Sequence, residues 1–433
     1  MKSEPVRPPS VDSVARELSE SFSLPHAILV DCARRAIADD PAHASDTARR
    51  YAQVFADAML VDVVNATGVL LHTNLGRAPL PDLSIGRASN LEFDMTTGQR
   101  GSRHSAIAQL ISVLTGAEDA IVVNNNAAAV MLVLAALAHD RDVAVSRGES
   151  VEIGGGFRIP EVMEQSGARL VDVGTTNRTR LSDYEKAINS KRHDVALVMK
   201  IHPSNFAIEG FTQDVSISEL ATCSVPVVAD IGSGLIDNTC PWLHGVTPQI
   251  PHWLVNEPAA KQAISDGAAL VTFSGDKILG GPQCGIIAGK KDLVEKCARH
   301  PFMRALRPGG HTILALQETL MSYCARTACE DIPFWFMVSQ SADAIRERAD
   351  AIVRDTHMGR VIALDSLVGA GSAPGTTLPS YGIACPGDVR QRLRSHSIPV
   401  IARTIDDTTY LDLRSVHPND DVVIRDALVS LGQ

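Results

Sequence analysis

Six short apolar segments that alternate with helix-like stretches restrict the possible folds of this chain more than any other feature. They are AIVV (120–123), VAVS (143–146), RLVDV (169–173), ALVMKI (196–201), PVVAD (226–230) and ALVTFS (269–274). Strands that alternate with helices favour a mostly parallel sheet covered on both faces. We therefore expect a large α/β domain over residues 61–310.

The segments on either side of this region have different patterns. Residues 1–60 carry apolar side chains at helical spacing, such as Val14, Leu18 and Phe22, which predicts a short N-terminal helical segment. The stretch HTILALQETLMSYCAR (311–326) predicts a linker helix. Helical and strand-like segments follow it, so residues 311–433 are expected to form this helix and a small C-terminal α+β domain.

Composition excludes several classes of protein. With 45% hydrophobic and 21% charged residues in 433, the chain has the make-up of an ordinary globular protein. None of its eight cysteines forms a C-x-x-C pair, which argues against a zinc site or a disulfide framework and favours reduced thiols in the cytoplasm. No apolar run approaches the roughly 20 residues of a membrane helix, and no apolar segment follows the N-terminal charges, so neither a membrane span nor a signal peptide is expected.

The net charge of −10 argues against a broad basic surface for nucleic acid. Any site for a polyanion must therefore be a local cluster of basic residues.

The segment LVTFSGDKILGGPQCG (270–285) contains a candidate cofactor lysine. An apolar strand ends in a small polar turn that places Lys277 at the carboxyl edge of the sheet, where open α/β proteins keep their sites. A lysine there can bond to the aldehyde of pyridoxal 5'-phosphate (PLP), and burial would lower its pKa. Ser274 could donate to the cofactor phosphate. An ordinary surface turn with a solvated lysine fits this stretch equally well.

Two further strand ends carry polar groups. VVNNNAAAV (122–130) ends a strand and opens a helix, whose first N–H groups could hold a phosphate. Its asparagines could instead form only a polar loop and helix cap. Asp230, in VVADIGSG, could hydrogen-bond a pyridinium nitrogen and keep it protonated. The alternative for Asp230 is a turn or N-cap residue.

Arginines recur in three glycine-containing or polar segments. Arg77 lies in TNLGRAP, Arg100 and Arg103 lie in GQRGSRH, and Arg304 and Arg307 lie in HPFMRALR. Guanidinium groups bind phosphates and other oxyanions with two parallel hydrogen bonds. Each arginine alone could be solvated or salt-bridged, but as a set they indicate an anionic substrate.

These segments, taken together, resemble bacterial selenocysteine synthases (L-seryl-tRNA(Sec) selenium transferases), PLP-dependent enzymes of the aspartate aminotransferase fold, fold type I. The similar segments are NATGVLLHTNLGRA (65–78), GQRGSR (98–103), NNNAAAV (124–130), SRGESVEIGGGFRIP (146–160), VGTTNRT (173–179), HPSNFAIEGF (202–211), DIGSG (230–234), FSGDKILGGPQCG (273–285), HPFMRALR (300–307) and, more loosely, IPVIART to YLDLR (398–414). They follow the order of the family along the chain.

The resemblance implies a role for each candidate residue. Lys277 would form the Schiff base with PLP, and Asp276 beside it would be the active-site aspartate. The implied cofactor-binding residues are Lys277, Asp230, Asn124, Asn125, Asn126, Ala127 and Ser274. The implied substrate-binding residues are Arg77, Arg100, Arg103, Thr175, Thr176, Arg304 and Arg307. It identifies no residue that stacks on the ring, and no metal site.

The implied reaction converts L-seryl-tRNA(Sec) to L-selenocysteinyl-tRNA(Sec) with selenophosphate, by β-replacement through a dehydroalanyl-tRNA intermediate. Family members assemble as large rings of dimers, which predicts a homo-oligomer. Residues 1–60 depart from the family, because this candidate tRNA-recognition segment is shortened and slightly acidic. The alternative is a PLP-dependent lyase or transferase that acts on a small amino acid or amino sugar without tRNA. A tRNA-binding protein without activity would require that Lys277 cannot bind PLP.

Overall fold

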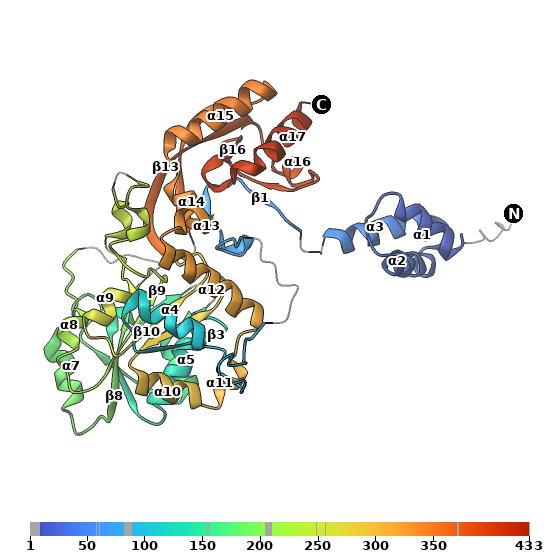
Figure 1. Cartoon of the computed structure of the whole chain (residues 1–433). Coiled ribbons are helices and arrows are strands. Elements are labelled where there is room, and N and C mark those ends of the chain that lie inside the picture. The colour runs from blue at the N-terminus through green and yellow to red at the C-terminus, as the bar shows by residue number, and fades with distance from the viewer. Residues whose placement is uncertain are drawn as a thin grey trace. The chain divides into compact units, whose positions relative to one another are not determined.

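The computed structural model describes residues 9–57, 59, 61–81, 89–153, 156–203, 210–247, 249–255, 257–369 and 372–432. The chain divides into two compact units, Met1–Val63 and Val64–Gln433, which we describe separately (Figure 1). In the part of the chain described, no helix is both long and apolar enough to cross a membrane.

The described residues of the first unit form three α-helices, α1 (Val11–Ser19), α2 (His26–Asp39) and α3 (Ala44–Asp57), with a short 3-10 helix (Pro41–His43) between α2 and α3. Ser10 caps α1, because its Oγ accepts a hydrogen bond from Ser13 N at 3.1 Å. Leu18 and Leu29 pack with small residues of the other helices, such as Ala48, to form a core of their own. The division of the chain at residues 60 and 310 stays a prediction.

A seven-stranded sheet forms the centre of the second unit, in the order β3-β11-β10-β9-β8-β4-β7. The strands are β3 (Asp119–Val123), β4 (Asp142–Ser146), β7 (Arg169–Val173), β8 (Val195–Ile201), β9 (Val227–Gly232), β10 (Leu270–Ser274) and β11 (Gly285–Gly289). All neighbours pair in parallel except β11, which is antiparallel to β3 and β10. The six apolar segments form six of these strands, so the expected α/β fold is confirmed.

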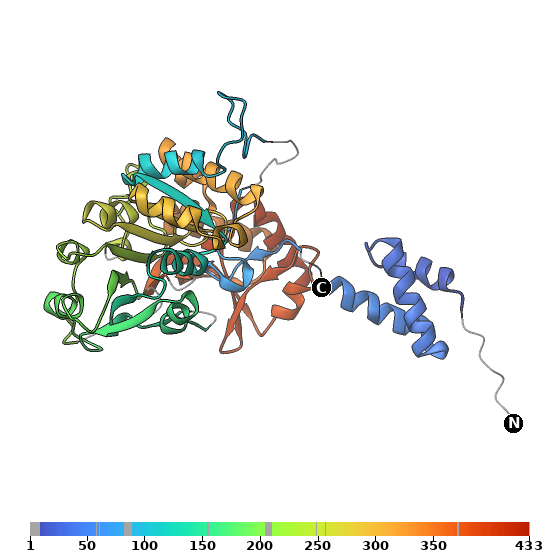
Figure 2. The ribbon, with the colours of Figure 1, turned by 90° about the horizontal axis from the view of Figure 1, so that it is seen from below.

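Helices cover both faces of this sheet (Figure 2). Along β3, Ala120 and Val122 belong to one hydrophobic core, whereas Ile121 and Val123 belong to another. Successive side chains of a strand point to opposite faces, so the two cores lie on opposite sides of the sheet. Helices α4 (Ser105–Thr115), α9 (Ala260–Ser265) and α12 (Gly310–Ala325) contribute to the first core, and α5 (Asn126–Leu137), α6 (Ile159–Ser166) and α10 (Lys291–Arg299) to the second.

A second sheet of five strands has the order β15-β16-β13-β12-β2. Its long hairpin is β12 (Arg360–Gly369) and β13 (Ser372–Pro386), and β15 (Arg403–Ile405) and β16 (Thr408–Asp412) extend it. Strand β2 (Val69–Leu71) joins it from the start of the unit, and β1 (Val64–Asn65) pairs with β14 (Val400–Ile401). Helices α15 (Ala342–Thr356) and α17 (Asp421–Leu431) pack in the same core as this sheet.

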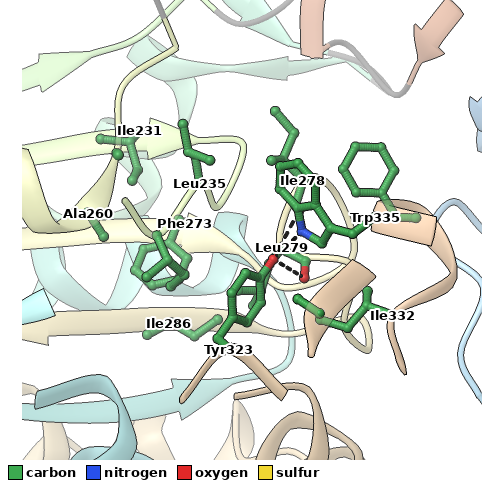
Figure 3. Close-up of a cluster of buried hydrophobic side chains, with 14 of the residues drawn as sticks. Ile231, Leu235, Ala260, Phe273, Ile278, Leu279, Ile286, Tyr323, Ile332 and Trp335 are labelled. Atoms are coloured by element: carbon green, nitrogen blue, oxygen red, sulfur yellow. Dashed lines mark hydrogen bonds between the residues drawn. The ribbon is translucent and has the colours of Figure 1, made fainter. Parts of the chain in front are cut away.

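The segment after Lys277 is held by aromatic side chains of α12 and α14 (Pro333–Ser339). Tyr323 Oη donates to the carbonyl of Leu279 at 2.9 Å and accepts from Trp335 Nε1 (Figure 3). Trp242 packs edge-on against both rings, with centroids 4.7 and 5.1 Å away. The cluster therefore connects two helices to the turn that carries the candidate lysine.

We expect Tyr323→Phe to lower the free energy of unfolding by about 1–3 kcal/mol, because Trp335 Nε1 and Leu279 O would both lose a buried partner. Urea unfolding followed by circular dichroism measures this change. Tyr381→Phe is the control, since Tyr381 is only partly buried beside Arg346. Equal stability of both variants and the parent would show that the Tyr323 hydroxyl does not hold this turn.

Candidate active site

The candidate cofactor residues meet where parallel strands end. Asp230 lies on β9, Ser274 is the last residue of β10, and Lys277 follows in the next turn. Because β9 and β10 are parallel neighbours, their carboxyl ends lie at the same edge of the sheet.

Lys277 is only 8% exposed. Burial lowers the pKa of Lys277, and the positive charge of Arg77 lowers it further, whereas Asp230, Asp276 and Glu257 oppose the shift. A lysine in this environment has a larger fraction of neutral amine than a solvated one. The neutral amine is the form that attacks an aldehyde.

Asp230 is 3% exposed and is held by two donors. Its Oδ1 accepts from Asn126 Nδ2 at 2.8 Å and from Gly232 N at 3.2 Å. Burial raises the pKa of Asp230, and the hydrogen bond from Asn126 and the charge of Lys277 oppose this shift. A carboxyl group in this position suits a pyridinium N–H, whose charge would offset the cost of burial.

The turn before α5 has the form of a phosphate site. Asn125 Oδ1 accepts from Ala128 N at 2.9 Å and so caps the helix, while the first N–H groups of a helix have no partner within it. A Cβ at Gly285 would lie 2.2 Å from Asn125 O, so only glycine lets β11 approach this turn. Ser274 pairs with Gly285 across the β10–β11 ladder, and this pairing brings Ser274 close to the turn before α5.

Asn124 has a different role from the other residues of this turn. Its backbone N donates to Leu306 O at 3.0 Å, which ties the turn to the HPFMRALR segment. The backbone N–H of Asn124 is therefore engaged within the protein, whereas that of Asn126 is at the start of the helix.

Arg77 and Asp276 form an ion pair beside Lys277. Arg77 Nη1 lies 2.7 Å from Asp276 Oδ2, and Asp276 is 3% exposed. Arg77 has a φ of +68°, a left-handed conformation that is uncommon for residues other than glycine. The surrounding structure therefore holds Arg77 in a strained turn that directs it to Asp276.

Three of the other predicted arginines converge on Glu92, which sequence analysis missed. Arg100 Nη2 donates to Glu92 Oε2 at 2.9 Å, and Arg103 Nε and Arg307 Nη1 lie 2.8 and 3.3 Å from Oε1. The three cations outweigh the single carboxylate, so the cluster keeps an excess of positive charge. Nothing in the sequence indicated that Glu92 accepts hydrogen bonds from these arginines, because Glu92 lies outside the arginine motifs.

The remaining arginine and a histidine lie close to this cluster. The exposed side chain of Arg304 makes no hydrogen bond or ion pair with any residue described, although its charge lowers the pKa of Arg307. Burial and the charges of Arg103 and Arg307 lower the pKa of His104 to about 4. No hydrogen bond or ion pair joins these residues to Lys277 in the described structure.

Thr175 and Thr176 lie at a cavity of ≈ 320 Å³, which Asp230 and His202 also line. Lys200 also lines this cavity, and its Nζ donates to Glu149 Oε1 at 2.7 Å and to Asp214. Sequence analysis did not select Glu149, Lys200 or His202. Glu149 and His202 do fall in segments that resemble the family, and that is the signal that could have identified them.

The residues fit PLP. They supply a buried lysine for the aldehyde, a buried carboxyl group for the ring nitrogen and the start of a twelve-residue helix for the phosphate. Asn126 Oδ1 is buried and has no partner among the residues described, so a polar group remains to be satisfied at this point.

Comparisons with known proteins agree with this geometry. A profile of the L-seryl-tRNA selenium transferase family matches residues 63–417. The L-seryl-tRNA(Sec) selenium transferase of Carboxydothermus hydrogenoformans is 44% identical over 82% of this chain and 78% of its own length. That of Solidesulfovibrio magneticus is 42% identical over 94% of this chain and 86% of its own.

A solved structure shares the fold. The structure of D-glucosaminate-6-phosphate ammonia-lyase has a TM-score of 0.56 and covers 87% of this chain and 97% of its own, at 20% identity.

We expect Gly285→Ala to weaken PLP binding about tenfold or more and to lower the free energy of unfolding by about 1–3 kcal/mol, because the added methyl displaces the Asn125–Asn126 turn. Titration of the apoprotein with PLP measures the first effect. Gly309→Ala is the matched control, because a Cβ at Gly309 meets no atom within 4 Å. Unchanged PLP affinity in Gly285→Ala would separate this turn from the cofactor site.

Proposed function

This chain belongs to the L-seryl-tRNA selenium transferase family, and we propose that it converts L-seryl-tRNA(Sec) to L-selenocysteinyl-tRNA(Sec) with selenophosphate as the selenium donor. The cofactor is PLP. The observation that carries the proposal is the joint burial of Lys277 and Asp230 at the edge of the sheet, beside the start of α5.

We assign the cofactor to the residues of this edge. Lys277 would hold the aldehyde carbon, Asp230 the ring nitrogen, and Ser274 with the turn Asn124–Ala127 the phosphate. Bound PLP supplies an electron sink for the charge that develops on the seryl α-carbon, which allows the β-substituent to leave and be replaced.

We assign the proton on the seryl α-carbon and the proton on the ring nitrogen to side chains of this site. The Lys277 amine, with its pKa lowered by burial, is suited to take the proton from the α-carbon. Asp230 would keep a proton on the ring nitrogen. Asp276 holds Arg77 at 2.7 Å and so fixes one guanidinium next to the lysine.

We assign the selenium donor to the arginines. Arg77 lies beside the lysine, and Arg100, Arg103 and Arg307 share Glu92. The side chain of Arg304 is exposed and has no partner among the described residues. Guanidinium groups bind phosphate through bidentate hydrogen bonds and can stabilise it as a leaving group. Thr175 and Thr176 would contact the substrate from the cavity they line with Asp230.

The first unit and the oligomer complete the proposal. We assign recognition of the tRNA body to the three-helix unit, Met1–Val63. A homo-oligomer built from dimers would bring further arginines to each site. The similarity to the ammonia-lyase, at 20% identity, supports the fold alone, so we do not propose a reaction on an amino sugar.

We expect the visible absorption of the PLP-loaded protein to change on addition of seryl-tRNA(Sec) but not of seryl-tRNA(Ser). An absorption band that neither RNA changes would be consistent with a PLP enzyme and would exclude seryl-tRNA(Sec) as its substrate.

Lys277→Ala should abolish selenium transfer with no loss of secondary structure, because no other residue described could replace its amine at this position. Normal activity of Lys277→Ala would exclude the mechanism.

We expect Arg304→Ala and Arg307→Ala each to slow selenium transfer about tenfold or more while PLP affinity changes little, because the lost group binds the phosphate of the donor. Single-turnover assays with selenophosphate and PLP titrations measure the two effects. Arg299→Ala is the control, since Arg299 pairs with Glu295 on the exposed side of α10. Unchanged turnover of selenophosphate in both variants would remove these arginines from the site.

A further inference from the structure

Two polar side chains near Lys277, the buried Glu257 and the partly buried His202, have no part in the reaction as assigned so far. Glu257 is 5% exposed, and its Oε1 has no hydrogen-bond partner among the described residues. His202 Nε2 lies 3.8 Å from that oxygen. A buried carboxylate oxygen without a partner is costly, so its presence here calls for an explanation.

His202 is placed next to the candidate cofactor residues by the sheet. It follows β8, where Ile201 pairs with Asp230 on β9, and His202 N donates to Asp230 O at 2.9 Å. His202 and Asp230 line the same cavity of ≈ 320 Å³. Lys277 is near enough for its charge to lower the pKa of His202.

The chemistry of PLP identifies the group that would face His202. The phenolic oxygen is attached next to the aldehyde-bearing carbon, on the side away from the phosphate arm. The phosphate is assigned to the turn between β3 and α5, and β3 and β8 lie on opposite sides of β9 and β10 in the sheet. A ring held by Lys277 and Asp230 with its phosphate at α5 would therefore direct its phenolic oxygen toward the end of β8.

We propose that His202 donates a hydrogen bond to the phenolic oxygen of bound PLP, and that Glu257, buried behind it, fixes the imidazole in the orientation required. His202 is then a cofactor-binding residue and Glu257 a positioning residue. This proposal rests on the cofactor placement given under the proposed function.

The environment of the pair favours one arrangement of protons. Burial, together with the charges of Lys200 and Lys277, lowers the pKa of His202 to about 4 against the opposing charge of Asp214, so the imidazole is neutral near pH 7. Burial raises the pKa of Glu257, against the charge of Lys277. Glu257 Oε1 faces Nε2 at 3.8 Å, which leaves Nδ1 as the imidazole nitrogen that would donate to a phenolate.

The test compares the affinity of the apoprotein for PLP and for 3-deoxypyridoxal 5'-phosphate, which lacks the phenolic oxygen, by quenching of tryptophan fluorescence. The parent should bind the deoxy compound about tenfold more weakly. His202→Phe should bind PLP about tenfold more weakly than the parent, because the donor to the phenolic oxygen is gone. The variant should bind the two compounds equally, because without that donor the phenolic oxygen no longer contributes a hydrogen bond.

Variants of Glu257 test its positioning role separately. Glu257→Leu should reduce the preference for PLP over the deoxy compound, whereas Glu257→Gln should keep it, since an amide can donate to Nε2. His139→Phe is the matched control and should keep the full preference, because this mostly exposed histidine lies after the far end of α5.

Three results would overturn the proposal. They are equal binding of the two compounds by the parent, a tenfold preference retained in His202→Phe, or, if His202→Phe does not fold, a full preference in both Glu257 variants. Failure of the parent to transfer selenium, with the tenfold preference intact, would instead overturn the proposed function and leave the role of His202 in place.

Discussion

The burial of a lysine and an aspartate at the ends of neighbouring strands is the constraint on which the rest of the structure depends. An isolated charge in the protein interior costs several kcal/mol, and a nearby opposite charge and hydrogen-bond donors reduce that cost. Lys277 and Asp230 provide the opposite charges, and Asn126 and Gly232 donate to the carboxylate. The parallel pairing of β9 and β10 is what brings the two groups to one edge.

The position of Lys277 is fixed from both directions along the chain. Before it, β10 lies in the middle of the large sheet, and after it, Tyr323 holds the carbonyl of Leu279. Across the sheet, Gly285 permits the close approach of β11 to the turn that opens α5. These contacts come from segments far apart in the sequence, so the geometry of the site depends on the completed fold and not on the local motif alone.

The sequence predicted the elements whose signal is local. Five of the six strands were readable because burial on both faces requires a run of apolar residues, while β7 at the edge of the sheet is partly exposed. Asp230 and Lys277 were readable because they lie at or just after the ends of two such runs. Strand β11 was missed, since GIIAG begins and ends with glycine and follows a glycine-rich turn. The pairing of β2 with β12, and the contact of Glu257 with His202, join distant segments and leave no periodic pattern.

Glu92 shows why the arginines could be identified from sequence while their arrangement could not. Guanidinium groups repel one another, so Arg100, Arg103 and Arg307 can gather only if a carboxylate lies among them. One carboxylate compensates one of the three charges and leaves an excess of two, and Arg304 adds a further cation nearby. A phosphate group carries about two negative charges near neutral pH, which is the complement of that excess. Glu92 thus stabilises the arginine cluster before an anion binds, and the cluster keeps enough positive charge to bind that anion.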